Sequence, residues 1–397
     1  MKQENYVYKS YCRVCSGKLK DLIKLKPQFL SPTFVKSNSR NKLAKIKIPL
    51  TLCICKNKKC SLVQLRETTN PNLLYKNYFY RSSTNEMMLN DLKKVVKKVK
   101  KFVTLKKNEI VVDIGANDCS MLSYFPKSSK RVGVEPASNI NWSRVEKSID
   151  IINDFFPSKK FADYVDKKKV KIFTSCAMFY DLEEPNLFVK SIKKNLDDNG
   201  VWCVQLSYVL LMLKNLNFYD ICHEHLEYYS LQSLNYLMKK HELEIVHAET
   251  NNVNGGSALV FIKHKKKQNK KTKEFKRLIL LEKKMNITSP IVYKNFYKKM
   301  NNLSTKVTKF IKKQLINKKL VIGLGASTKG NILLQFFGIN KNILPYISEK
   351  QKIKVGLKTL GSDIELISEN KARKLNPSCM LMLPWYFKEE IILREIK

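Results

Sequence analysis

The sequence predicts an α/β protein of several domains, and two patterns lead to this expectation. Between about residues 71 and 265, apolar strand-like runs alternate with helical stretches, an order that indicates a parallel sheet covered by helices on both faces. A second unit of the same kind follows a lysine-rich connector, where the strand-like run KKLVIGLGA precedes the helical pattern KGNILLQFF. A chain of 397 residues is long enough for two or three domains with separate cores.

Changes in composition divide the chain into three predicted modules. Residues 1–70 contain half of the ten cysteines and lack a long amphipathic helix. Residues 71–265 contain four strand candidates, which read EIVVDIGAN, RVGVEP, VKIFTSCAM and GVWCVQLS. Residues 266–397 comprise the helical connector and the second α/β unit. We therefore expect a small cysteine-rich module followed by two Rossmann-like domains.

The formal net charge of +41 raises the question of a nucleic-acid partner, because clustered Lys and Arg neutralise phosphates. The basic residues are nevertheless spread along the whole chain. Their densest runs, at 93–101 and 265–273, lie between apolar segments, where exposed helices or linkers are expected. We therefore favour solvated lysines on exposed faces, and we keep a nucleic-acid-binding protein as the rival interpretation.

No segment has the character of a signal peptide or a membrane span. The chain begins MKQENYVYKSYC, and no apolar run reaches the roughly 18 residues that cross a bilayer. We expect a cytoplasmic protein that has no membrane partner. In that reducing compartment, cysteines are thiols or metal ligands more often than disulfides.

Four cysteines near the N-terminus have the spacing of a structural zinc site. Cys12 and Cys15 form a C-x-x-C pair, and Cys55 and Cys60 form a second pair about forty residues later. Two such pairs supply four thiolates to a tetrahedral Zn²⁺, which leaves no open position for chemistry. Cys53 competes with Cys55, but Cys55 stands nearer the turn that carries Cys60 and is preferred. Ordinary buried thiols are the alternative.

The segment VVDIGANDCSML has the features of a cofactor site. Its glycine lets a ligand approach the backbone, and a turn that opens a helix presents free amides. Glu135 ends the next strand, RVGVEP, where an acid binds both ribose hydroxyls of an adenosine-containing cofactor. Together these features favour S-adenosylmethionine over NAD, and a turn that binds nothing is the alternative. The candidate cofactor-binding residues are Asp113, Gly115, Asn117, Asp118, Glu135 and Pro136.

Two of the five histidines stand together in YDICHEHLEYYSLQSL. His223 and His225 flank Glu224, and their spacing suits a loop or strand rather than the H-E-x-x-H helix of metalloproteases. We interpret the three as catalytic residues, because an imidazole oriented by a carboxylate can remove a proton next to a ketone. The resulting enolate is the nucleophile that methyl transfer to carbon requires. A metal site and a structural cluster are the alternatives; Cys222 and Tyr228 are candidate substrate contacts.

Two further segments are candidates for binding the substrate. In NYFYRSSTNEM, the hydroxyls of Tyr78 and Tyr80 can donate hydrogen bonds to a developing enolate oxygen, although the segment alone resembles a surface loop. In VIGLGASTKGNILL, a glycine turn at a helix start suits a phosphate or pyrophosphate, and a turn used only for packing is the alternative. The candidate residues of this second segment are Gly325, Lys329 and Asn331.

In their order along the chain, these motifs resemble the sugar C-methyltransferases of deoxysugar and surface-polysaccharide biosynthesis. The resemblance covers nearly the whole chain and is most specific in H-E-H-L-E-Y-Y-S and in G-L-G-A-S-T-K-G-N. It implies a zinc-binding N-terminal domain, a class I methyltransferase domain that uses S-adenosylmethionine, and a C-terminal α/β domain that helps to hold a nucleotide-linked keto sugar.

The resemblance also implies residue roles. His225 corresponds to the base that removes the proton alpha to the keto group, Glu224 orients it, and Tyr78 and Tyr80 line the sugar. Three positions depart from the family pattern and are expected to face substrate, namely Asp181 and Cys222, where histidine and tyrosine are usual, and Leu259, where arginine is usual. A methyltransferase of another small-molecule acceptor therefore remains an alternative, as does a nucleic-acid-binding protein with a vestigial cofactor pocket.

Overall fold

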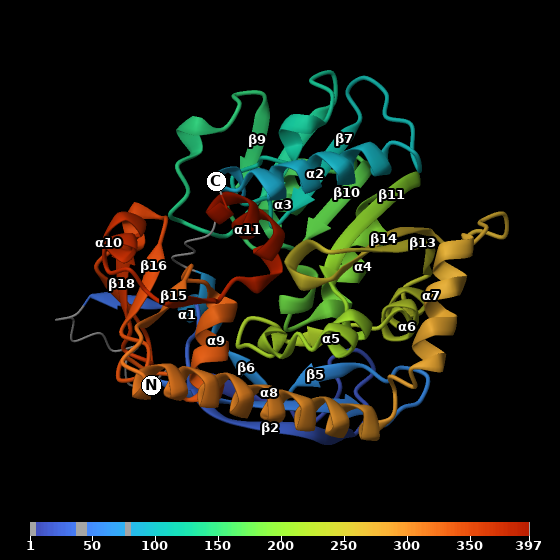
Figure 1. The fold of residues 1–397 in the computed structure, drawn as a ribbon. Helices are drawn as coiled ribbons and strands as arrows, with labels where there is room; N and C mark the ends of the chain where they lie inside the picture. Colours follow the sequence, from blue (N-terminus) through green and yellow to red (C-terminus); the bar gives the residue numbers. More distant parts are fainter. Residues whose placement is uncertain (1–4, 37–45, 76–80, 397) are drawn as a thin grey trace.

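The structure is a computed structural model, which describes residues 5–36, 46–75 and 81–396 (Figure 1). It is an α/β fold with three main sheets. The central sheet occupies the upper half of Figure 1, the N-terminal sheet lies along the bottom and the C-terminal sheet lies at the left. A two-stranded ribbon of β1 (Tyr6–Tyr8) and β6 (Glu67–Thr69) accompanies the N-terminal sheet.

The central sheet has seven strands in the order β13-β14-β11-β10-β7-β8-β9. The strands are β7 (Ile110–Ile114), β8 (Lys130–Val134), β9 (Ile149–Ile152), β10 (Val170–Cys176), β11 (Leu196–Ser207), β13 (Leu243–Asn251) and β14 (Ser257–His264). Only β14 runs antiparallel to its neighbours. The strand order reverses between β7 and β10, and ligands bind at such a reversal, beside the carboxyl ends of the strands.

Helices cover both faces of this sheet, as the alternating sequence pattern predicts. They are α2 (Glu86–Val99), α3 (Lys159–Val165), α4 (Pro185–Asn195), α5 (Val209–Asn215) and α6 (Leu231–Lys240). α2 begins at an Asn85 side-chain cap and buries Leu92, Val95, Val96 and Val99 against the sheet. All four strand candidates of the central module form strands, namely β7, β8, β10 and β11.

The N-terminal sheet is antiparallel and has the order β12-β5-β4-β2. Its own strands are β2 (Leu19–Phe29), β4 (Lys47–Cys55) and β5 (Val63–Leu65). The fourth strand, β12 (Glu227–Tyr228), comes from the central module and pairs with β5. The short helix α1 (Pro71–Tyr75) follows the ribbon.

The C-terminal sheet has six strands in the order β19-β15-β16-β18-β17-β3. The strands are β15 (Val321–Leu324), β16 (Tyr346–Glu349), β17 (Leu357–Thr359), β18 (Glu365–Ser368), β19 (Cys379–Met382) and β3 (Phe34–Lys36). β15, β16, β18 and β19 are parallel, and β3 is contributed by the N-terminal module. The helices are α9 (Thr328–Phe337), α10 (Glu369–Lys374) and α11 (Lys388–Ile396).

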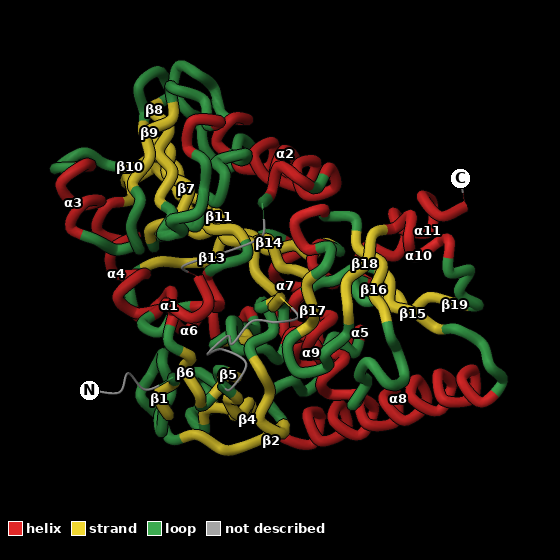
Figure 2. Tube along the Cα trace, turned by 90° about the vertical axis from the view of Figure 1, so that its left-hand side faces the viewer, coloured by secondary structure: helices red, strands yellow, loops and turns green. Residues whose placement is uncertain are grey.

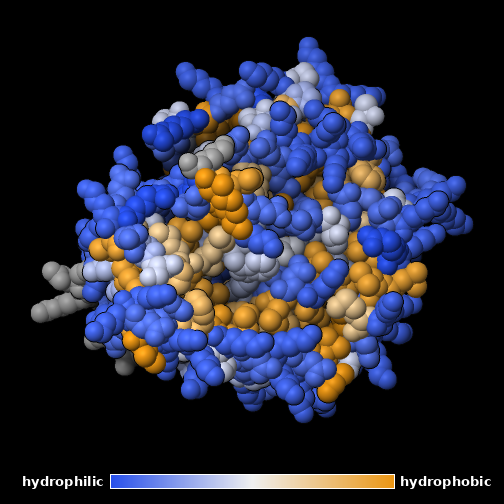
Figure 3. Space-filling view, viewed as in Figure 1, coloured by the Kyte–Doolittle hydropathy of each residue, from blue (hydrophilic) through white to orange (hydrophobic). Residues whose placement is uncertain are grey.

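The lysine-rich connector forms two helices, α7 (Lys273–Lys284) and α8 (Pro290–Ile316). α8 lies below the C-terminal sheet in Figure 2, with one end near β2. It contacts β2, α5, α9 and β15, so it links all three modules. Within the described residues, no helix is both long and apolar enough to cross a membrane. Hydrophilic residues cover most of the face in Figure 3, in agreement with lysines that decorate exposed surfaces.

Two local expectations differ from the structure. The turn after β7 does not open an α-helix but continues through further turns into a short 3-10 helix, Leu122–Tyr124. Asn117 and Cys119 have positive φ angles there, a conformation that does not propagate as an α-helix. The three modules also exchange strands, because β12 and β3 each complete the sheet of another module.

Candidate functional site

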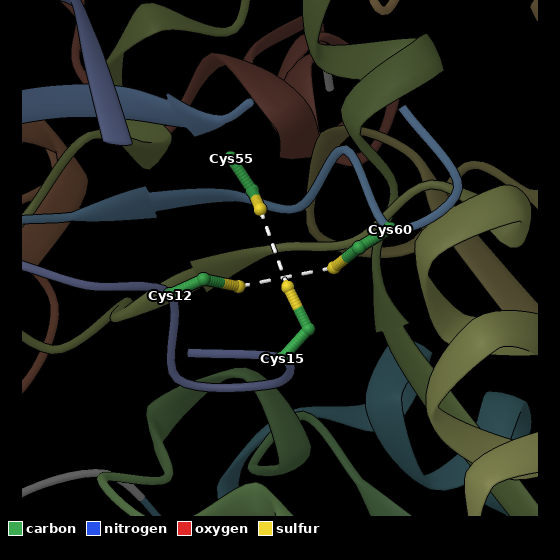
Figure 4. A group of neighbouring side chains, drawn as sticks. All are labelled: Cys12, Cys15, Cys55 and Cys60. Atoms are coloured by element: carbon green, nitrogen blue, oxygen red, sulfur yellow. Dashed lines mark hydrogen bonds between the residues drawn. The ribbon is translucent and has the colours of Figure 1, made fainter. Parts of the chain in front are cut away.

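Four cysteine thiols meet at one end of the N-terminal sheet. Cys12 and Cys15 stand in the turns before β2, Cys55 ends β4, and Cys60 lies in the turn before β5. Their sulfur atoms lie within 4.8 Å of one another and point toward a common centre (Figure 4). Cys53 is not in this group, and its Sγ donates a hydrogen bond to a backbone carbonyl of β5 at 3.3 Å.

The sulfur positions fit a tetrahedral zinc ion. Zn–S bonds of roughly 2.3 Å place neighbouring sulfurs about 3.8 Å apart. The Sγ atoms of Cys12 and Cys60 are 3.8 Å apart, and those of Cys15 and Cys55 are 3.4 Å apart. A Cβ at Gly17 would lie 3.1 Å from the Cys55 sulfur, so this glycine leaves room for the cluster. Four thiolates suit a closed, structural site.

The zinc module also holds the H-E-H loop. β12 follows this loop directly and pairs with β5, and the Leu65 amide donates to the Leu226 carbonyl at 2.9 Å. Nε of Arg13 lies 3.6 Å from Oε1 of Glu227, and both side chains are buried. Because Arg13 stands between the first two cysteines, the metal cluster and the H-E-H loop share one rigid unit.

One cavity of about 1100 Å³ is lined by residues of all three modules. It reaches the carboxyl ends of β7 and β15, where Gly115 and Gly325 line its wall. Ligand pockets commonly measure roughly 300–1,000 Å³, so this cavity has room for a cofactor and a second ligand.

The turn after β7, residues 115–118, is the candidate cofactor site and is called the cofactor turn below. Backbone amides there hold a carboxylate in the cavity wall. The amides of Asn117 and Ala137 donate to the two oxygens of Glu135 at 2.8 and 2.9 Å. Burial raises the pKa of Glu135. Gly115 has φ +72°, and a Cβ at this position would lie 2.9 Å from Cγ of Met178. Glycine therefore keeps the turn open.

Asp113 supports the same turn from inside the sheet. It stands on β7, one residue before the strand end, and accepts a hydrogen bond from Oγ1 of Thr174 at 2.6 Å. Burial raises the pKa of Asp113 to about 7. The open glycine turn and the Glu135 carboxylate at the next strand end fit an adenosine-containing cofactor.

The H-E-H loop lines the cavity with all three of its residues. The His225 ring packs edge-on against Tyr180, with ring centroids 4.3 Å apart, and bonds to the Asp220 backbone carbonyl. Burial, with a smaller contribution from the Lys329 charge, lowers the pKa of His225 to about 3. Burial raises the pKa of Glu224 to about 7, which the Lys329 charge opposes. His225 is thus neutral near pH 7 and can accept a proton.

His223 faces the zinc module as well as the cavity. Its Nε2 lies 3.3 Å from the Ile48 carbonyl of β4, and burial lowers its pKa to about 4. This contact ties one end of the H-E-H loop to the N-terminal sheet. His223 is therefore placed to fix the loop, whereas the His225 ring packs against the ring of Tyr180.

The Lys329 side chain is enclosed by partners. Its Nζ lies 2.6 Å from Oδ1 of Asp220 and 2.8 Å from the Asn254 carbonyl. The rings of Tyr219 and Tyr386 lie 5.3 Å from the same nitrogen. The sequence predicts Lys329 as part of a phosphate site, and in the structure Asp220 already balances its charge, because a buried ammonium requires such partners.

The structure brings most of the predicted site residues to the cavity wall. Besides the H-E-H residues, they are Asp113, Gly115, Asn117, Glu135, Pro136, Asp181, Cys222, Gly325 and Lys329. Tyr78 and Tyr80 lie outside the described residues. These lining residues come from segments far apart in the sequence, and the fold gathers them in one place.

Four residues predicted to contact a ligand lie outside the cavity lining, and their roles stay predictions. Asp118 accepts from the Ser83 amide, and the Tyr228 hydroxyl donates to the Asp220 carbonyl. Asn331 lies a full turn inside α9 and donates to the Ser31 carbonyl of the N-terminal module. Leu259 is buried in the core of the central sheet on β14. The side chains of Asp118, Tyr228 and Asn331 thus bond to backbone groups around the cavity.

Sequence reasoning missed several residues of the cavity wall. Met178 ends the run VKIFTSCAM and Tyr180 lies two residues later, and the strand end at a sheet reversal is the signal that could have identified them. Glu349 is the last residue of β16 in the C-terminal unit, and Glu135 directly follows β8. Lys354 lies a few residues further on and lines the same cavity.

Three family models match successive parts of the chain and together span nearly all of it. They describe a zinc binding domain at residues 12–75, a methyltransferase domain at residues 88–248 and a C-methyltransferase C-terminal domain at residues 252–397. The fold and site thus define an S-adenosylmethionine-dependent C-methyltransferase that also carries zinc. The chain has the three domains that these models describe for such C-methyltransferases, in this order.

The chain is similar to several known proteins. The C-methyltransferase NovU of Streptomyces niveus is 26% identical over 349 residues, which are 87% of this chain and 83% of the relative. Solved structures include the plantazolicin methyltransferase BpumL with SAH, at 12% identity and a TM-score of 0.37, covering 46% of this chain and 87% of that one. A methyltransferase from Clostridium acetobutylicum, at 9% identity and a TM-score of 0.35, covers 44% and 92%.

Proposed function

We propose that the protein methylates a carbon next to the keto group of a nucleotide-linked sugar. The observation that carries this proposal is the shared cavity, in which a neutral imidazole at His225 lies in the same enclosure as the Glu135 turn and the Gly325 turn. Such a reaction belongs to deoxysugar or surface-polysaccharide biosynthesis.

In this mechanism His225 is the base. Its neutral ring accepts the proton alpha to the ketone, and the electron pair moves into an enolate on the substrate. Glu224 orients the imidazole, whose ring packs edge-on against Tyr180. Tyr78 and Tyr80 remain our candidates for hydrogen bonds to the enolate oxygen. When bound, S-adenosylmethionine supplies a methyl group on a sulfonium, whose departure as a neutral thioether needs no acid.

The other residues of the site hold the cofactor and the H-E-H loop in position. We propose that Glu135 and the Gly115 turn hold the cofactor, while the buried Lys329–Asp220 pair fixes the H-E-H loop against the C-terminal domain. We assign Cys12, Cys15, Cys55 and Cys60 to a structural zinc ion, and His223 to holding the loop on the zinc module.

The three-part division at residues 1–70, 71–265 and 266–397 stays a proposal. The exchanged strands β3 and β12 show why the parts depend on one another. We expect that a fragment cut at these boundaries exposes an unpaired sheet edge.

The test is an assay with S-adenosylmethionine labelled in its methyl group and a panel of nucleotide-linked keto sugars. We expect label on a carbon adjacent to the keto group of at least one member of the panel. Label on oxygen or nitrogen, or transfer only to acceptors without a nucleotide, would contradict the proposal. Binding to RNA or DNA that falls steeply with salt, without any transfer, would favour the nucleic-acid interpretation.

A further inference from the structure

The C-terminal domain contains a second turn with a carboxylate held by backbone amides. At the end of β15, the Gly325 amide donates to the Ser348 carbonyl of β16 at 2.8 Å. The Ala326 amide donates to Oε2 of Glu349 at 2.8 Å, and the Gln351 amide donates to Oε1 at 2.7 Å. Glu349 is thus fixed at a strand end, with only 6% of its surface exposed.

This arrangement repeats the cofactor turn. There, the Gly115 amide donates to the last residue of β8 at 2.9 Å, and Glu135, 7% exposed, accepts one amide from the turn and one from two residues after itself. Gly115 and Gly325 have similar positive φ angles, +72° and +77°. β15 also lies between β16 and β19, as β7 lies between β8 and β10, so both turns stand where the strand order reverses.

Both carboxylates line the one large cavity. An ionised carboxylate has about four acceptor positions, and two backbone amides use only two of them. At each turn, two positions are left for two hydroxyl donors. A ribose carries two neighbouring hydroxyls, at C2′ and C3′, and an acid at this place in a Rossmann-like domain binds them.

The surroundings of Glu349 suit the rest of a nucleoside diphosphate. α9 begins at the Gly325 turn, and Ser327 caps it, so the turn has the geometry that binds phosphate at a helix start. Nζ of Lys354 donates to the Ala326 carbonyl at 3.1 Å and lies 5.0 Å from the centre of the Phe34 ring. Lys354 therefore places a positive charge beside the Gly325 turn, so a phosphate at this turn does not need Lys329 as its counter-charge.

We propose that Glu349 binds the 2′- and 3′-hydroxyls of the substrate's ribose, so that the acceptor is linked to a ribonucleoside diphosphate rather than to a 2′-deoxyribonucleoside diphosphate. The inference rests on the proposed function and deepens it by naming the class of nucleotide. It makes Glu349 a specificity-determining residue, because a 2′-deoxyribose leaves one of the two acceptor positions of the buried carboxylate without a donor.

The first test compares matched nucleotide pairs on the wild-type protein by calorimetry. The pairs are UDP, GDP and CDP, each against its 2′-deoxy form, so that each pair differs in one hydroxyl. We expect at least one ribonucleotide to bind about tenfold or more tightly than its 2′-deoxy partner, since a hydrogen bond to a charged group is worth roughly 1.5–3 kcal/mol. Equal affinities within every pair would overturn the inference.

The second test uses two conservative variants with crossed measurements. Glu349→Gln should reduce ribonucleotide affinity about tenfold, remove the preference over the 2′-deoxy form and leave SAH affinity unchanged. Glu135→Gln should do the reverse, with weaker SAH binding and unchanged nucleotide affinity. If Glu349→Gln keeps the ribose preference, the assignment is wrong. SAH binding by Glu349→Gln reports that the variant is folded.

The outcomes separate this inference from the proposed function. If nucleotides bind equally with and without the 2′-hydroxyl and keto sugars are methylated, only the Glu349 assignment fails. If no nucleoside diphosphate binds at all, both fail.

Discussion

Nζ of Lys329 lies 2.6 Å from Oδ1 of Asp220, and the two side chains are buried together at the junction of the C-terminal and central domains. Lys329 is the second residue of α9, whereas Asp220 lies three positions before His223, the first residue of the H-E-H loop. Burial raises the pKa of Asp220 and the Lys329 ammonium opposes that rise, so each group depends on the other for its charge. The pair therefore fixes the position of the H-E-H loop relative to the Gly325 turn.

Removing one member of this pair should destabilise the protein. Lys329→Met leaves a buried carboxylate without a counter-charge, and we expect a loss of about 3–5 kcal/mol in the free energy of unfolding. The double variant Lys329→Met with Asp220→Asn should recover part of it. Denaturant unfolding measures both, with Lys298→Met on the exposed face of α8 as the control. A loss no larger than that of the control would contradict the role of the pair.

Loss of the metal should affect both the fold and the reaction. Cys60→Ser removes one thiolate, and because metal binding contributes directly to folding, we expect zinc release and a lower Tm. Turnover should fall too, since β12 and the H-E-H loop are held on the zinc module. Cys53→Ser is the matched control, since Cys53 is equally buried but lies outside the cluster. Unchanged zinc content in Cys60→Ser would refute the ligand set.

Acid should weaken the fold through His225. Its pKa is lowered to about 3 in the folded protein, while an unfolded histidine titrates near 6.5. A group with a lowered pKa contributes stability above the unfolded value and loses that contribution as pH falls from 6.5 toward 3. Between pH 7 and pH 5 this amounts to about 2 kcal/mol. Between pH 7 and pH 5, the free energy of unfolding of His225→Gln should therefore fall by about 2 kcal/mol less than that of the wild-type protein. An identical pH dependence of the two proteins would count against a neutral buried imidazole.

We expect the ionisation of Glu224 to determine how turnover falls at acid pH. Burial raises its pKa to about 7, so the carboxylate that orients His225 forms as pH rises through that value. We expect turnover to increase through about pH 7 and the increase to be absent in Glu224→Gln. A wild-type profile that stays flat between pH 6 and pH 8 would show that the charge of Glu224 does not matter.

The local parts of this architecture follow from sequence patterns. Apolar runs that end in Asp113 and Glu135 indicate strands that feed a ligand turn, and the paired cysteines indicate a metal, because the determinants lie within a few residues of each other. The choice of Cys55 over Cys53 also rests on a local feature, the position of the turn that carries Cys60.

Other features depend on contacts between distant segments. β12 is a two-residue strand whose partner β5 lies in another module, and no local pattern encodes that pairing. The bond from Asn331 to the Ser31 carbonyl likewise joins two modules and has no local signal. Glu349 differs, because an acid at the end of the second strand of an α/β unit is a local pattern from which the sequence alone could have identified it.

The central claim is that His225 removes a proton next to the ketone. Incubation of a keto-sugar substrate with the protein and SAH in D₂O tests it most directly, because exchange of the alpha hydrogen reports carbanion formation without methyl transfer. We predict exchange by the wild-type protein, and a rate roughly 10²–10⁴-fold lower for His225→Ala with SAH affinity unchanged. Exchange by His225→Ala at the wild-type rate would contradict the account.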